Sequence, residues 1–124
     1  MKRTDINHPK HYANGMKVDV ECIMYTCNLD FVLGNAFKYI WRSGEKITEA
    51  MDKDLLKAKW YLDYAIKHRG RYPRERCTTE HLIAFLPKFM LLEWKYNILA
   101  CILSYDLSKA LALLVNGMDS DTAS

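Results

Sequence analysis

The sequence predicts an all-α protein, a compact helical domain of about five or six helices with an extended N-terminal arm. Three observations predict this class. Two stretches, 31–43 and 51–65, carry apolar residues at helical spacing. A third stretch, 87–103, is apolar nearly all round, as in a buried helix. No stretch alternates apolar and polar residues over the length of a strand.

The length of 124 residues and the 50% hydrophobic content are typical of one domain with one core. We therefore expect a single helical domain over 1–117. Its predicted parts are an arm (1–15), a motif region (16–68), a basic linker (69–78) and apolar C-terminal helices (79–117), followed by a disordered tail (118–124).

Composition excludes several classes of function. The net charge of +3 is too small for a dedicated duplex binder, so a nucleic-acid partner is not expected. Charged residues interrupt every long apolar run, so no membrane helix is predicted. The four cysteines lack metal-site spacing and no cleavable signal sequence is visible, which indicates free thiols in a reducing compartment.

The arm contains two histidines that invite a metal or catalytic interpretation. His8 and His11 are close in sequence, but the further ligands that a zinc site needs are missing, so no metal site is predicted. We expect instead that the arm docks and lends His11 and Tyr12 to a ligand pocket. The alternative is that these side chains only pack.

Each of the first three helices is preceded by a residue that can cap it. The pairs are Asp19 for a helix over 20–27, Asp30 for a helix over 31–43, and Thr48 for a helix that ends at 68–70. Gly34 lies inside the second helix, where glycine costs up to about 1 kcal/mol relative to alanine. This cost predicts that a neighbouring backbone or a ligand approaches closely there.

The apolar stretch 87–103 must be either central in its own domain or buried between subunits. In so small a chain the second alternative carries at least equal weight, so we expect a homo-oligomer formed through this helix. The last helix is expected to follow Asp106 or Ser108 and to stop at Asn116-Gly117, a sequence typical of a left-handed helix exit.

The polar faces of the second and third helices predict a ligand-binding groove. Their cations can converge on one polyanion, their tyrosines can stack on a base or sugar, and a carboxylate can orient an acceptor. No phosphate-binding glycine loop is present. The predicted groove residues are Asn35, Lys38, Tyr39, Arg42, Lys46, Asp54, Lys57 and Tyr61.

A structural interpretation of the same residues stays open. The charged residues can form a surface ion network between two antiparallel helices, each pair contributing about 0–1 kcal/mol. Tyr39, Trp41, Trp60 and Tyr61 can be ordinary core or interface aromatics. The basic linker can likewise bind phosphates or be a solvated connection.

Three motifs in the first half of the chain resemble a family of small tailed-phage proteins known as phage nucleotide kinase-like proteins. The first is HPKHY at 8–12, the second LDFVLGNAFKYIWRSGEK at 29–46 and the third DLLKAKWYLDYAI at 54–66. The resemblance covers about the first 66 residues and leaves the second half unmatched. It implies phage origin, the cytoplasm of an infected bacterium, and a role in deoxynucleotide metabolism.

Two functions of different classes follow from this resemblance. In the first, the protein is a nucleoside monophosphate kinase that takes a phosphoryl group from ATP or another nucleoside triphosphate. Lys38, Arg42, Lys46 and Lys57 then hold phosphates, Asp54 or His11 orients the acceptor, and Tyr12, Tyr39 or Tyr61 contacts the base or sugar. In the second, the protein binds a nucleotide signal of host defence and sequesters it without catalysis.

Overall fold

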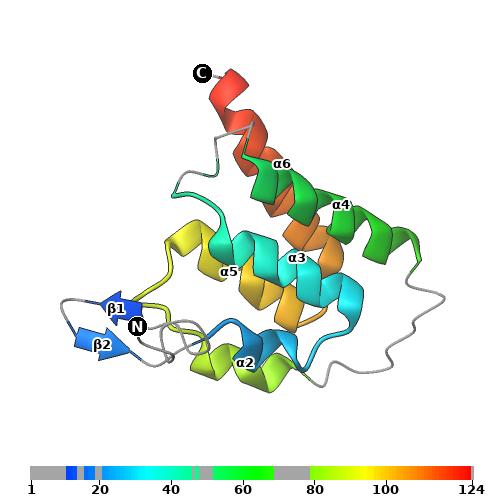
Figure 1. The fold of residues 1–124 in the computed structure, drawn as a ribbon. Helices are drawn as coiled ribbons and strands as arrows, with labels where there is room; N and C mark the ends of the chain where they lie inside the picture. The colour runs from blue at the N-terminus through cyan, green and yellow to red at the C-terminus, as the bar shows by residue number, and fades with distance from the viewer. Residues whose placement is uncertain are drawn as a thin grey trace.

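The computed structural model describes the backbone of residues 11–13, 16–18, 21–45, 47, 52–68 and 79–123, and the side chains within 21–119 of this set. The chain is mostly helical, which confirms the all-α class (Figure 1). The elements are β1 (His11–Ala13), β2 (Met16–Val18), α2 (Ile23–Thr26), α3 (Phe31–Arg42), α4 (Lys53–Lys67), the 3₁₀ helix η1 (Glu80–Phe85), α5 (Glu93–Leu103) and α6 (Leu107–Ala123).

Four helices surround the core. Helix α3 packs against α4 and α5, and α6 closes the arrangement by packing against both α4 and α5 (Figure 1). The apolar faces predicted for the second and third helices point into this core. Their fully buried members are Leu33, Ala36, Phe37 and Ile40 on α3, and Leu55, Ala58 and Leu62 on α4. Because the inner faces of α3 and α4 are used for packing, their polar faces remain available for a ligand.

An aspartate caps the N-terminus of each of the helices α3 and α4. Asp30 caps α3 as predicted, since its Oδ1 accepts a hydrogen bond from the backbone N–H of Leu33 at 2.8 Å. The prediction for α4 was wrong, because Asp52 and not Thr48 caps it. Oδ1 of Asp52 accepts from two N–H groups of α4, and its Oδ2 accepts from the N–H of Gly44 at 3.0 Å. One carboxylate thus ties the end of α3 to the start of α4.

Helix α5 is central in its own domain. Its side chains Ile98, Leu99, Ile102 and Leu103 are buried within the single chain, against α3, α6 and η1. The helix begins only at Glu93, later than the sequence predicted. Burial inside one chain accounts for the all-round apolar pattern, while association through this region stays a prediction. Within the described ranges, none of the helices has the length and apolarity needed to cross a bilayer.

Helix α6 shows where a local stop signal was misleading. The helix continues through Asn116-Gly117 to Ala123, so the predicted end at these two residues was wrong. A Cβ at Gly117 would overlap Cδ1 of Ile47 in the segment before α4. This glycine permits a close approach between two segments and does not end a helix.

The predicted N-terminal arm is not wholly extended. Strands β1 and β2 pair antiparallel, with Tyr12 opposite Lys17. They flank Asn14-Gly15, a dipeptide that strongly favours hairpins. Three-residue strands are too short to show alternation, so only that dipeptide could have predicted them. The predicted boundary between the arm (1–15) and the motif region (16–68) therefore separates two strands that pair with each other.

Replacing glycine by alanine is expected to change stability in opposite directions at Gly34 and Gly117, which both lie within described helices. At Gly34 an added methyl group would lie 3.5 Å from the carbonyl oxygen of Thr26, an ordinary contact. Gly34→Ala is expected to raise the free energy of unfolding by up to about 1 kcal/mol through helix propensity. Gly117→Ala gains the same propensity but must displace Ile47, which costs about 1–3 kcal/mol. Urea denaturation measures both, and equal stabilisation by the two substitutions would contradict the packing at Gly117.

Candidate cationic and aromatic groove between α3 and α4

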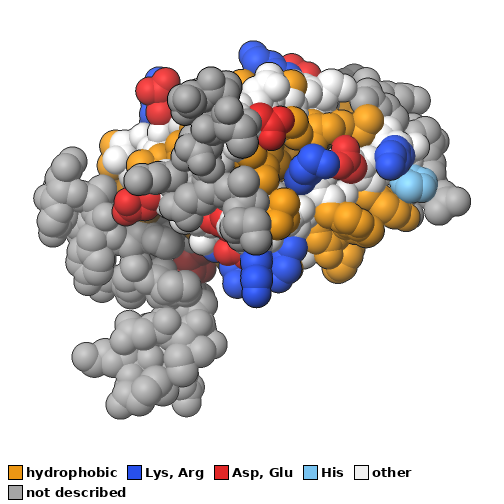
Figure 2. All heavy atoms as spheres, turned by 90° about the horizontal axis from the view of Figure 1, so that it is seen from above, with side chains coloured by type: hydrophobic (Ala, Val, Ile, Leu, Met, Phe, Trp, Pro, Cys, Tyr) orange, Lys and Arg blue, Asp and Glu red, His pale blue; other side chains and the backbone are white. Residues whose placement is uncertain are grey.

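The polar faces of α3 and α4 meet in antiparallel order. The end of α3 meets the start of α4, where Arg42 contacts Asp54. The start of α3 meets the second half of α4, where Phe31 packs edge-on against Tyr61 with ring centroids 6.4 Å apart. Charged side chains therefore occupy one end of the groove and aromatic side chains the other. Figure 2 shows positively charged side chains gathered on one part of the surface beside an exposed hydrophobic area.

Three cations gather around the ring of Tyr39. The Nζ atoms of Lys38 and Lys57 lie 4.4 and 5.3 Å from the ring centroid, and Cζ of Arg42 lies 5.6 Å from it. Attraction to the ring face offsets part of the repulsion among the three charges. The groove thus concentrates positive charge from both helices at one place, where it can bind a phosphate-bearing ligand.

Asp54 of α4 pairs with one member of the cation cluster, which we define as Lys38, Arg42 and Lys57. Its Oδ2 lies 3.5 Å from Nε of Arg42. The Arg42 side chain is 58% exposed and that of Asp54 is 22% exposed, so the pair is open to solvent on one side. A ligand phosphate can compete with Asp54 for the guanidinium.

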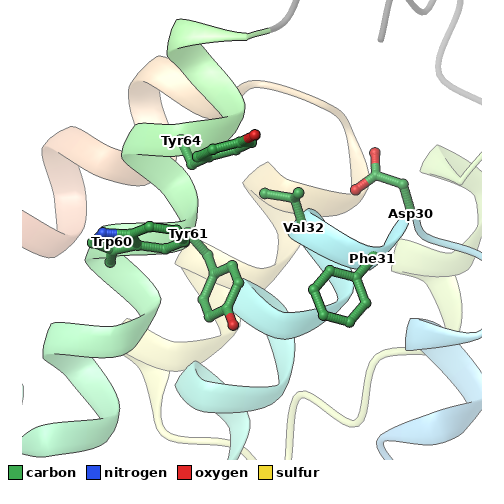
Figure 3. Close-up of a pocket in the computed structure, with 6 residues that line it drawn as sticks. All are labelled: Asp30, Phe31, Val32, Trp60, Tyr61 and Tyr64. Atoms are coloured by element: carbon green, nitrogen blue, oxygen red, sulfur yellow. The ribbon is translucent and has the colours of Figure 1, made fainter.

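The aromatic end of the groove forms a pocket of about 390 Å³. Tyr61 connects it to the cation cluster, since its ring stacks on Tyr39 with centroids 5.9 Å apart and also lines the pocket. The lining residues are Asp30, Phe31 and Val32 from the start of α3, and Trp60, Tyr61 and Tyr64 from α4 (Figure 3). Figure 3 shows the two groups facing each other across an opening.

Several of these pocket residues were not predicted as site residues. The helical period predicts Tyr61 and Tyr64 on one face of α4, whereas Trp60 and Phe31 are not among the predicted groove residues. Both are well exposed, Phe31 at 77% and Trp60 at 59%. A large aromatic at the first position of a capped helix, opposite a second aromatic cluster, was the available signal.

The remaining predicted site residues contribute less. Asn35 donates its side-chain N–H to the carbonyl oxygen of Phe31 at 2.8 Å, so its amide nitrogen is already engaged within α3. Lys46 and the side chains of His11 and Tyr12 lie outside the described residues. Their predicted roles stay predictions.

Lys95 anchors the end of α3 from the apolar half of the chain. Its side chain is buried, and Nζ donates to the carbonyl oxygens of Trp41 and Ser43 at 3.1 and 2.6 Å, on either side of Arg42. Burial lowers the pKa of Lys95, an effect that nearby carboxylates oppose. A cation at a helix C-terminus is favourable. Lys95 thereby fixes the backbone that carries Arg42, a contact between residues far apart in the chain that no local pattern predicts.

The Cys22 thiol, at the N-cap position of α2, is affected by the charge of Lys38. Burial raises the pKa of the Cys22 thiol to about 12, while the Lys38 ammonium acts in the opposite direction. Cys22 is therefore a neutral thiol at physiological pH and packs at the core boundary.

The fold and the groove define a small all-α protein with a cationic and aromatic surface between two helices. Residues 6–63 match the model of a family described as "Protein of unknown function (DUF3310)". That match spans α3 and most of α4, and it includes the cation cluster.

One curated relative agrees with phage origin. The chain is 39% identical over 74 residues to the Gene 1.7 protein of Enterobacteria phage T3. The match covers 55% of this chain and 45% of the relative, so the chain spans less than half the length of that protein. No solved structure matches the chain.

Proposed function

We propose that this chain is a phage nucleotide-binding protein with nucleotide kinase-like activity on (deoxy)nucleoside monophosphates, acting in the cytoplasm of the infected host. The observation that carries the proposal is the gathering of Lys38, Arg42 and Lys57 around Tyr39. Phosphoryl transfer depends chiefly on positioning and charge stabilisation, so cations on rigid helices supply its main requirement without a glycine-rich phosphate loop.

In this proposal the cation cluster binds the phosphates of the donor, ATP or another nucleoside triphosphate, and of the acceptor. Asp54 orients the acceptor phosphate through Arg42, with which it is paired. Tyr39 and Tyr61 contact the sugar or base. The similarity to the phage nucleotide kinase-like motifs supports this assignment.

A second candidate is a non-catalytic binder that sequesters a nucleotide signal of host defence. One observation favours it: both carboxylates at the start of α4 are engaged, Asp52 with backbone N–H groups and Asp54 with Arg42. A binder needs the cations but not a free acid. The two candidates differ in turnover.

The deciding experiment incubates the protein with ATP and each deoxynucleoside monophosphate and follows diphosphate formation by mass spectrometry. The small molecules released on denaturing the freshly purified protein are identified in parallel. A kinase forms a diphosphate, and Asp54→Asn removes this turnover while leaving nucleotide binding in place. Tight stoichiometric binding of a co-purified nucleotide, with no diphosphate formed, assigns the protein to sequestration.

A further inference from the structure

We infer that the aromatic pocket at the start of α3 is the base-binding subsite of the groove, where a nucleobase packs against Trp60 of α4 and Phe31 of α3. The inference rests on the proposed function. It adds the part of the ligand that the cation cluster cannot recognise, and it assigns a role to Phe31, Trp60 and Tyr64.

The first argument is the exposure of the aromatic side chains. The rings of Trp60 and Tyr64 lie nearly parallel, with centroids 5.5 Å apart and planes inclined by 24°. Trp60 is 59% exposed and Phe31 on the facing helix is 77% exposed. Exposing large apolar rings next to one another is unfavourable in water, and such clusters mark binding surfaces. Tyr64 also stacks on His68, with ring centroids 4.0 Å apart, so the well exposed ring surface at the pocket is that of Trp60 and Phe31. Figure 3 shows these two side chains on opposite sides of the pocket.

The second argument is the shape and chemistry of the pocket. Its volume of about 390 Å³ falls in the range of small-molecule sites. Its wall is aromatic and aliphatic except at Asp30. Oδ1 of Asp30 caps α3. The carboxylate thus gives the pocket one polar edge that can accept a hydrogen bond from a base.

The third argument is continuity with the cation cluster. Tyr61 lines the pocket and stacks on Tyr39, the ring around which the cations gather. Asp54, Lys57, Tyr61 and Tyr64 recur at helical spacing along one face of α4. From Lys57 to Tyr64 the helix rises about 10 Å, which lies within the length of an extended nucleotide from base to terminal phosphate. Base and phosphates can therefore occupy the two ends together.

The experiment uses isothermal titration of the full chain with ATP, the four deoxynucleoside monophosphates, deoxyribose 5-phosphate and inorganic triphosphate. Trp60→Leu is expected to weaken the tightest-binding nucleotide about ten-fold or more, the effect of losing one base-stacking side chain. The affinity of the Trp60→Leu chain for inorganic triphosphate should equal that of the unaltered chain. Trp60→Phe should restore most of the loss because it keeps a stacking face. Phe31→Leu should resemble Trp60→Leu.

A matched control is Phe85→Leu, because Phe85 on η1 is similarly exposed at 69% and does not line the pocket. It should bind every ligand as the unaltered chain does. Unchanged nucleotide affinity in both Trp60→Leu and Phe31→Leu, with Lys57→Ala still weakening it, overturns the base subsite and leaves the proposed function standing. A Trp60→Leu chain that changes its sedimentation but not its affinity also overturns it, because the patch is then a protein interface. Absence of binding to nucleotides and triphosphate alike overturns both proposals.

Discussion

Lys57→Ala is expected to lower the affinity for a nucleotide about ten-fold or more, since a hydrogen bond to a charged group contributes about 1.5–3 kcal/mol. Lys57 is well placed for this test because it is exposed and contributes its charge from α4, whereas Lys38 and Arg42 contribute theirs from α3. Removing it should leave the helical circular dichroism intact. Isothermal titration at two salt concentrations measures the loss.

Lys38→Ala and Arg42→Ala should each act in the same direction and should also abolish phosphoryl transfer if the chain is a kinase. The matched control is Lys59→Ala. Lys59 is on the same helix but pairs with Asp63 at 3.1 Å instead of contacting Tyr39. If Lys59→Ala weakens binding as much as Lys57→Ala, the effect is one of net charge and the cation cluster is not the site.

Lys95→Met is expected to lower the free energy of unfolding by about 1–3 kcal/mol, because two carbonyl oxygens at the end of α3 lose their donor. Ser43 is buried, so water cannot readily replace the hydrogen bond that its carbonyl oxygen accepts from Lys95. Methionine keeps much of the apolar volume of lysine, which limits any cavity. Denaturation in urea measures the loss, and Lys59→Met should change stability by no more than a few tenths of a kcal/mol.

The stability difference between the unaltered chain and Lys95→Met should depend on pH in a defined direction. Burial lowers the pKa of Lys95 below its ordinary value of 10.5, so the unfolded chain binds this proton more tightly than the folded chain. The contribution of Lys95 to stability therefore rises with pH from its folded pKa up to about 10.5. The advantage of the unaltered chain should widen toward alkaline pH. A constant or narrowing difference would show that burial does not govern this lysine.

The helical period accounts for the parts of the groove that could be predicted. Lys38, Tyr39 and Arg42 share a face of α3 because residues three and four apart lie side by side on a helix. The same rule placed Lys57 and Tyr61 together on α4. These relations are local, so they hold whatever the rest of the chain does.

Other parts depended on contacts between distant residues. Asn116-Gly117 looked like a helix end, but Gly117 instead accommodates Ile47 from the segment before α4. The sequence left open whether Trp60 is a core aromatic, and the structure instead exposes it across a pocket from Phe31 of α3. Local signals cannot distinguish these alternatives, because the outcome depends on which surface packs against which.

The sequence by itself determined an all-α chain with amphipathic α3 and α4, since the periodic spacing of apolar residues is a local property of each helix. Only the tertiary structure decided that α5 is central in one chain, that Lys95 holds the end of α3, and that the antiparallel pairing of α3 with α4 orders the groove from charged to aromatic. The physical reason is that burial and pairing are set by residues far apart along the chain, whose approach no local pattern records.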